Sequence, residues 1–216
     1  DILLYKYGNE ENTLRSTIEV HERSCRDIKF NAKGDAMISV SKDKSIVVTD
    51  VASEKMKRIY ENAHDCPINV ATIVNENVFA TGDDDGGIKL WDLRQRGHSP
   101  ILSVKENGDY ITAMLTNDDG KYLVCASGDG VLTTINVPSK KLHTQSEEYE
   151  EFSSLGLFKS NTKLLAAGNS GKMYVFNWGQ FGYHSDEFPN LTKKAINCSI
   201  PITDNIVITG GEDGLL

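Results

Sequence analysis

ATGDDDGGIKLWD occupies residues 80–92, and four related segments occur elsewhere in the 216-residue chain. They are SVSKDKSIVVTD (39–50), CASGDGVLTTIN (125–136), AAGNSGKMYVFN (166–177) and ITGGEDGLL (208–216). Each carries a turn residue at the same place, and these turn residues lie 42, 44, 41 and 43 residues apart, at Asp43, Asp85, Asp129, Ser170 and Asp213. A period of slightly more than 40 residues indicates that one structural module is repeated along the chain.

Each period contains four short apolar stretches separated by turn residues. If the incomplete unit at residues 1–20 is counted as the first period, the third spans residues 64–106. Its four stretches cover residues 68–73, 78–81, 88–91 and 101–105, and their lengths are typical of β-strands. The first stretch follows the pattern φ-x-x-φ-x-φ, where φ is apolar, as in Cys25, Ile28, Phe30, in Ile68, Ala71, Ile73 and in Phe152, Leu155, Leu157. Four-stranded antiparallel units repeated in this way pack around a common axis. The sequence therefore predicts an all-β fold, a β-propeller with one blade per period.

The segment that closes with Trp91-Asp92 resembles the repeat of the WD-repeat family. This resemblance implies a structural set of four hydrogen-bonding side chains in the third repeat, namely His64, Thr81, Asp85 and Trp91. The second repeat keeps part of the set, with Thr49 in place of the tryptophan, and its members are His21, Ser39 and Asp43.

The order of the segments also resembles the WD repeat-containing protein 55 subfamily, most specifically through NWGQFGYHSDEFP at residues 177–189. The other matching stretches are SKDKSIVVTD (41–50), AHDCPIN (63–69), NVFATGDDDGGIKLWDLRQ (77–95) and ASGDGVLTTINV (126–137). Seven blades are expected in the full protein, of which this chain would cover about five as one segment of a longer polypeptide. We expect residues 1–20 to end a first blade, residues 193–216 to form a truncated repeat, and the four repeats between them to span 21–63, 64–106, 107–148 and 149–192.

Composition argues against several classes of function. The chain has 23 lysines and arginines against 31 aspartates and glutamates, a formal net charge of −8, and no large basic cluster, so direct nucleic-acid binding by this segment is not expected. Its four cysteines form no C-x-x-C pair, which argues against a zinc knuckle. The longest apolar run covers only residues 122–126, far short of the roughly 20 residues of a membrane helix, so no membrane partner is expected.

Two polar sets share residue types with catalytic triads. They are Ser39, His21, Asp43 and Thr81, His64, Asp85. Because the same spacing recurs in successive repeats, we interpret both sets as buried polar groups that satisfy one another. The run GNSGK at residues 168–172 lacks the spacing of a phosphate loop, and residues 83–85 are interpreted as a solvated turn. We predict no enzyme activity, no cofactor, no metal and no small-molecule substrate.

Recognition by a propeller is expected at the loops and the channel mouth on one end of the blades. By their place in the repeat, six residues are predicted to contact protein partners: Arg26, Asn69, Asp84, Tyr110, Thr112 and Glu151. Arginine and aromatic side chains dominate binding hot spots, which favours Arg26 and Tyr110, while packing of Tyr110 between blades is the open alternative. Acidic residues in 83–85 and 147–151 would attract a basic partner, while solvated loops with no partner are the open alternative.

The resemblances imply two alternative functions. The subfamily resemblance implies a non-catalytic interaction scaffold of the nucleus and nucleolus, with the cytoplasm as a further location, that acts in ribosomal RNA processing and ribosome biogenesis through pre-ribosomal factors. The alternative is a substrate receptor of a cullin-RING ubiquitin ligase. It depends on residues 91–94, which are similar to a WDxR box whose arginine, here Arg94, docks on the cullin adaptor.

Overall fold

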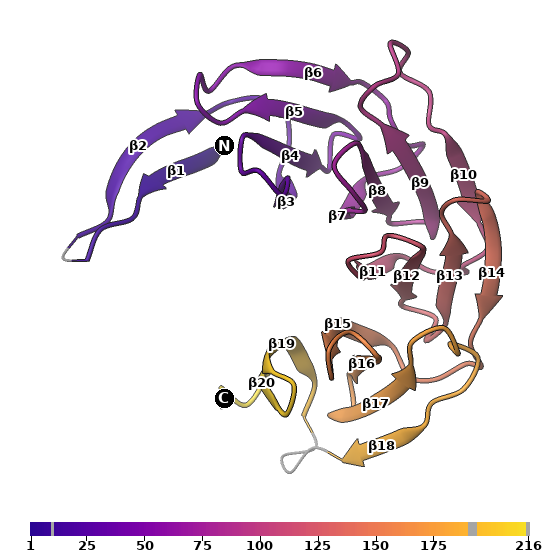
Figure 1. Cartoon of the computed structure of the whole chain (residues 1–216). Helices are drawn as coiled ribbons and strands as arrows, with labels where there is room; N and C mark the ends of the chain where they lie inside the picture. The colour runs from indigo at the N-terminus through magenta and orange to yellow at the C-terminus, as the bar shows by residue number, and fades with distance from the viewer. Residues whose placement is uncertain (10, 190–193, 215–216) are drawn as a thin grey trace.

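The computed structural model describes residues 1–9, 11–189 and 194–214, and every regular element within them is a β-strand. The strands form successive antiparallel sheets arranged as an open arc around a central channel (Figure 1). The predicted all-β propeller is therefore confirmed, with about five blades in this chain. The expected border between residues 192 and 193 lies outside the described residues.

Four of the sheets have four strands each, in sequential order from the channel outwards. The first contains β3 (Cys25–Phe30), β4 (Ala36–Ser41), β5 (Ile46–Asp50) and β6 (Met56–Tyr60). The second contains β7 (Ile68–Ile73), β8 (Val78–Asp83), β9 (Gly87–Asp92) and β10 (Leu102–Lys105). The third contains β11 (Ile111–Thr116), β12 (Tyr122–Ser127), β13 (Leu132–Asn136) and β14 (Lys141–Gln145). The fourth contains β15 (Phe152–Phe158), β16 (Lys163–Gly168), β17 (Lys172–Asn177) and β18 (Asp186–Pro189).

Two-stranded sheets lie at the two ends of the arc (Figure 1). One pairs β1 (Ile2–Lys6) with β2 (Thr13–Ile18), and the other pairs β19 (Ile196–Thr203) with β20 (Ile206–Gly211). The second of these sheets leaves four isoleucine side chains exposed, at positions 200, 202, 206 and 208. Exposed apolar side chains grouped on one sheet are typical of surfaces that contact other protein.

A β-bulge recurs in the innermost strand of each blade and explains the φ-x-x-φ pattern. In β7 the register shifts between Ile68 and Val70, so that Asn69 is the additional residue. The same shift occurs in β3, β11, β15 and β19. An extra residue reverses the alternation of the strand, and the buried side chains therefore stand three positions apart, as Ile68 and Ala71 do.

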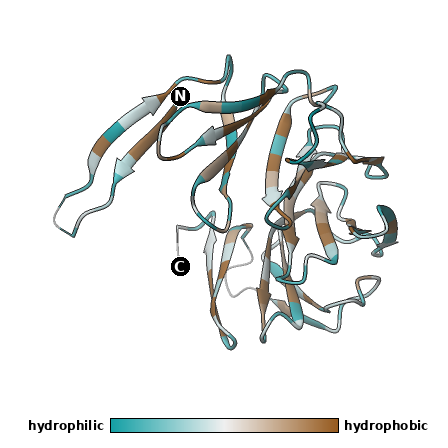
Figure 2. Cartoon of the chain, turned by 45° about the horizontal axis from the view of Figure 1, so that its top comes forward, coloured by the Kyte–Doolittle hydropathy of each residue, from teal (hydrophilic) through white to brown (hydrophobic). Residues whose placement is uncertain are grey.

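The core consists of apolar layers between neighbouring blades. Between the first two four-stranded sheets, Trp91 stacks on Phe79 with ring centroids 6.3 Å apart, and Tyr60 packs against both rings. Figure 2 shows hydrophobic residues along the strands and hydrophilic residues mainly in the connecting loops. Each blade therefore covers an apolar face of the next one, which leaves the loops and the channel rim as polar surface.

Candidate protein-interaction site at the channel mouth

A buried chain of hydrogen bonds connects four side chains of the blade formed by β7–β10. The indole N–H of Trp91 donates to Thr81 Oγ1 at 2.8 Å, and Thr81 Oγ1 lies 2.7 Å from His64 Nε2. His64 Nδ1 lies 2.6 Å from Asp83 Oδ2. If each group donates once, the imidazole is neutral with its proton on Nδ1. Burial lowers the pKa of His64, which agrees with a neutral ring.

The carboxylate in this chain is Asp83, so the assignment of Asp85 to the set is wrong. The Asp85 side chain is 66% exposed and pairs with Lys105. Asp83 is buried and accepts the backbone N–H groups of Asp85 and Gly87 at 3.0 and 2.7 Å. Burial acts to raise the pKa of Asp83, but hydrogen bonds from His64 and Gly87 outweigh it and hold that pKa below its usual value.

Gly87 is the reason that Asp83 can reach His64. A Cβ atom at position 87 would lie 2.5 Å from Asp83 Oδ2, closer than such contacts allow. The preceding blade has Ser45 at the equivalent place, because Ile46 pairs with Val40 there as Ile88 pairs with Gly82 here. The carboxylate of one blade therefore occupies the space that a side chain fills in the other.

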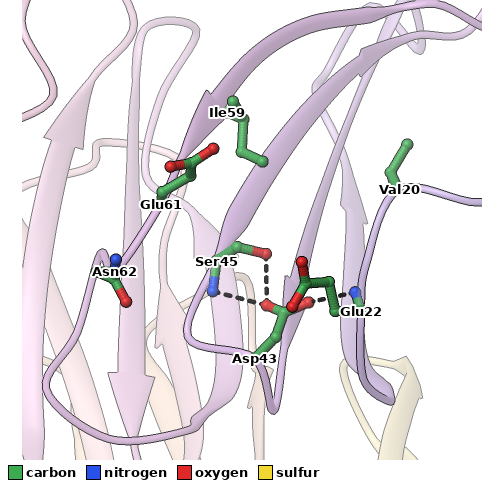
Figure 3. A pocket seen from close by; sticks show the side chains of 7 residues that line it. All are labelled: Val20, Glu22, Asp43, Ser45, Ile59, Glu61 and Asn62. Carbon is green, nitrogen blue, oxygen red and sulfur yellow. Dashed lines mark hydrogen bonds between the residues drawn. The ribbon is translucent and has the colours of Figure 1, made fainter.

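In the preceding blade a serine hydroxyl bridges the histidine and the carboxylate. Ser45 Oγ lies 2.8 Å from His21 Nδ1 and donates to Asp43 Oδ1 at 2.5 Å, while His21 Nε2 lies 2.8 Å from Ser39 Oγ. Asp43 Oδ2 accepts the backbone N–H of Glu22 at 2.8 Å (Figure 3). The structure thus brings His21, Ser39 and Asp43 together, with Ser45 as a member that the sequence comparison missed.

The hydroxyl groups of both sets lie in the interior of their blades. Ser39 and Thr81 are fully buried, and each hydroxyl is hydrogen bonded to its histidine. A nucleophile needs access to substrate and an oxyanion site, whereas these hydroxyls face the interior. The pocket beside Asp43 has a volume of about 250 Å³, and Ser39 is not among its lining residues. Side chains such as Glu22 and Glu61 line it (Figure 3).

Acid should destabilise the fold through the buried histidines. The folded-state pKa values of His64 and His21 are lowered by burial, so below about pH 6.5 the unfolded chain binds protons that the folded chain does not. We therefore expect the unfolding free energy to fall from pH 7.5 to 5.5, by up to about 1.4 kcal/mol per pH unit for each histidine. Urea unfolding at several pH values measures this slope. His64→Gln should make the slope shallower and His143→Gln, an exposed site, should not; equal slopes in all three proteins would contradict the assignment.

Five of the six residues predicted to contact partners form hydrogen bonds from one blade to the next. Arg26 is the bulge residue of β3, and its guanidinium donates to Asp84 Oδ1 of the next blade at 2.5 Å. Asn69 is the bulge residue of β7, and its amide donates to the Ile111 carbonyl at 2.8 Å. The mouth is therefore held together by polar side chains that reach from blade to blade.

Tyr110 and Glu151 form a further connection of this kind. The Tyr110 hydroxyl donates to Glu151 Oε1 of the next blade, and this hydrogen bond, with partial burial, raises the pKa of Tyr110 to about 12. Thr112 is the bulge residue of β11, and its buried Oγ1 has no hydrogen-bond partner within the described residues. Of the two interpretations of Tyr110, the contact between blades is the one that the geometry supports.

Removing the Tyr110 hydroxyl should weaken the seam between two blades. We expect Tyr110→Phe to lower the unfolding free energy by about 1 kcal/mol, because Glu151 loses a donor at a partly buried position. Urea denaturation measures the change. Tyr7→Phe is the matched control, since Tyr7 is 82% exposed, and an equal effect of both substitutions would contradict the role of Tyr110.

Two further places are open to solvent: the cavity between the innermost strands and the side chain of Arg94. A cavity of about 530 Å³ lies between the innermost strands and is lined by Arg26, Asn69, Thr112 and Ser153 among others. Arg94 lies in the connection between β9 and β10, with its side chain 67% exposed. Its guanidinium turns back onto Asp92, with Nε and Nη2 donating at 3.0 and 2.7 Å, and this pairing lowers the pKa of Asp92 to about 2.

The segment 177–189 contains anchoring residues whose roles sequence reasoning did not assign. Phe181 is 1% exposed and packs against Trp178 of its own blade and Tyr122 of the neighbouring one, with centroids 5.1 and 5.8 Å apart. His184 packs its ring against Tyr149 and Tyr174 at 5.5 Å. The clustering of aromatic residues in the sequence was the available signal, and it predicts packing but not which rings meet.

Neither a metal-ligand cluster nor a membrane-spanning helix is present among the described residues. No group of three or more histidine, cysteine, aspartate or glutamate side chains there is arranged to hold a metal ion. In the same residues there is no helix of the length and apolar character needed to cross a bilayer.

Repeated four-stranded blades with a buried Trp–Thr–His–Asp chain define this molecule as a WD-repeat propeller. The WDR55 family model matches residues 1–216. The WD repeat-containing protein 55 homolog of Aedes aegypti is 48% identical over 217 residues, which cover 100% of this chain and 46% of that protein. Its Drosophila persimilis counterpart is 49% identical over 215 residues, covering 99% and 42%. The chain belongs to the WD repeat-containing protein 55 family, and it spans less than half the length of these relatives.

Proposed function

We propose that this chain is a non-catalytic scaffold that binds other proteins through the rims and loops of a rigid propeller. The observation that carries the proposal is that the side chains able to do chemistry are already engaged with one another. His64, Thr81 and Asp83 are buried and joined by hydrogen bonds. Rigid blades that present variable loops suit recognition, since binding residues are commonly carried by loops on a stable framework.

The specific process that we propose is ribosomal RNA processing and ribosome biogenesis in the nucleus and nucleolus, with the cytoplasm as a further location. Membership of the WD repeat-containing protein 55 family and the resemblance that it confirms support this assignment. The partners would be protein components of pre-ribosomal particles. With a net charge of −8, this segment suits contacts to basic proteins better than direct contacts to RNA phosphates.

A second candidate function is that of a substrate receptor in a cullin-RING ligase. The exposed guanidinium of Arg94 favours it, because that group lies at the blade surface where an adaptor could reach it. Arg94→Ala should abolish recovery of the adaptor with the tagged protein if this function holds, while recovery of other partners stays unchanged.

Crosslinking with mass spectrometry on the tagged full-length protein in cells tests the proposal. We expect crosslinks between the propeller loops and ribosome-assembly factors, together with co-purification of those factors. Crosslinks only to a cullin adaptor would transfer the assignment to the second candidate. Turnover of a small molecule by the purified protein would contradict the scaffold function.

A further inference from the structure

An exposed cleft lies beside the segment that joins β17 to β18. We define this insertion cleft by its lining residues Asn177, Gln180, Gly182, Tyr183, His184 and Ser185, which enclose about 350 Å³. The segment forms part of the most distinctive stretch of the sequence, yet neither the propeller core nor the channel mouth uses its exposed residues. Among these, Tyr183 has a side chain that is 69% exposed.

The backbone on both sides of Tyr183 is firmly held. Glu147 donates its backbone N–H to the Gly182 carbonyl at 3.0 Å, and the N–H of Ser185 donates to the Val175 carbonyl at 2.6 Å. The Tyr149 hydroxyl accepts the His184 N–H at 3.2 Å and lies 3.0 Å from His184 Nδ1. Tyr183 is thus an exposed aromatic ring on a fixed loop, so binding through it costs little conformational entropy.

Acidic residues border the segment that carries Tyr183. Glu147 is joined to Gly182 through the backbone, Glu148 follows it, and Asp186 follows the cleft residue Ser185. None of the three takes part in an ion pair within the described part of the chain, and the Asp186 carboxylate accepts the Ser185 hydroxyl at 2.9 Å. The nearby Lys163 ammonium is held by Asn177 Oδ1 at 2.5 Å and lies 3.3 Å from Ser185 Oγ. An exposed aromatic ring on a segment bordered by acidic residues is complementary to a guanidinium group.

We propose that the insertion cleft binds an arginine-containing segment of a partner protein, with Tyr183 as the aromatic contact and Glu147 as the charged one. The proposal rests on the scaffold function and names one surface and the chemistry of its partner. Arginine suits the site better than lysine, because its planar cation stacks on a ring while its N–H groups reach carboxylates. A nucleic acid suits it less well, because phosphates would meet the same carboxylates.

Fluorescence anisotropy with the full-length protein tests this proposal. The probe is a fluorescein-labelled peptide of alternating glycine and arginine, compared with peptides that carry lysine or glutamate instead. We expect the arginine peptide to bind most tightly and to weaken as salt is added. Tyr183→Ala should weaken it about fivefold and Glu147→Gln about threefold, whereas Tyr183→Phe should stay within about twofold of the unchanged protein.

Two control variants test whether the effect on affinity is specific to the cleft residues or would follow from the loss of any exposed ring or carboxylate. Tyr7→Ala removes an aromatic ring that is more exposed than Tyr183, and Glu19→Gln removes one exposed carboxylate at the other end of the arc; neither should change the affinity by as much as twofold. The proposal would be overturned if Tyr7→Ala and Tyr183→Ala lost equal affinity for the arginine peptide, or if neither lost any. Tighter binding of an oligouridine RNA than of the arginine peptide would also overturn it. If partners still co-purify in any of those cases, the scaffold function stands and the cleft assignment alone fails.

Discussion

Asp83→Ala should lower the free energy of unfolding by about 4 kcal/mol, whereas Asp85→Ala should change it by no more than about 0.5 kcal/mol. The two residues are close in sequence, but only Asp83 is buried. Its removal leaves the Nδ1–H of His64 and the N–H of Gly87 without an acceptor in the interior, and each orphaned donor costs about 1–3 kcal/mol. Urea unfolding followed by tryptophan fluorescence measures both changes, since Trp91 belongs to the same chain of hydrogen bonds.

Asp83→Asn provides the matched control for shape. It keeps one carbonyl oxygen for His64 but loses the charge, so an intermediate loss is expected. Similar losses for Asp83→Ala and Asp85→Ala would mean that the buried chain does not end at Asp83, and the assignment would fail.

Gly87→Ser should lower the free energy of unfolding by about 2–3 kcal/mol, because the new Cβ displaces the Asp83 carboxylate from His64. The double variant Asp83→Ser/Gly87→Ser is expected to be more stable than the sum of the single losses predicts. It places serines where the preceding blade has Ser41 and Ser45, and leaves Asp85 in the place of Asp43. The new serine could then bridge His64 and Asp85 as Ser45 bridges His21 and Asp43.

A double-mutant cycle tests this exchange. A favourable coupling of about 1–2 kcal/mol between positions 83 and 87 is expected, in the range of side chains that share one network. Additive losses would show that the two blades do not use interchangeable arrangements. Gly97→Ser is a suitable control because no atom lies within 4 Å of a Cβ built there.

The propeller could be predicted from the sequence because its signal is local and repeated. The period of the turn residues identified the blades, and the predicted strand at residues 68–73 agrees with β7. The predicted strand at 78–81 ends two residues before β8 does. Those two residues include Asp83, whose side chain caps the turn that begins there.

The details of the site were harder to predict because they depend on contacts between blades and across turns. Spacing from the turn placed Asp43 and Asp85 at equivalent positions, and both are aspartates, so sequence comparison could not reveal that Asp83 replaces Asp85. The decisive difference is a missing Cβ at Gly87, which matters only when the turn is folded. Likewise, exposed hot-spot residues were expected at Arg26 and Tyr110, but each pairs with an acid of the neighbouring blade, 58 and 41 residues further along the chain.

The recurrent bulge in the innermost strands adds a residue that can line the channel without taking part in the regular pairing of the strand. A bulge residue has no direct opposite in the ladder, so the identity of Arg26, Asn69, Thr112, Ser153 or Asn197 is not dictated by strand register. One such position per module lets mutation rewrite the lining of the axial opening while the scaffold keeps its geometry. Related propellers that bind different partners could therefore arise by substitution of a few side chains at these sites.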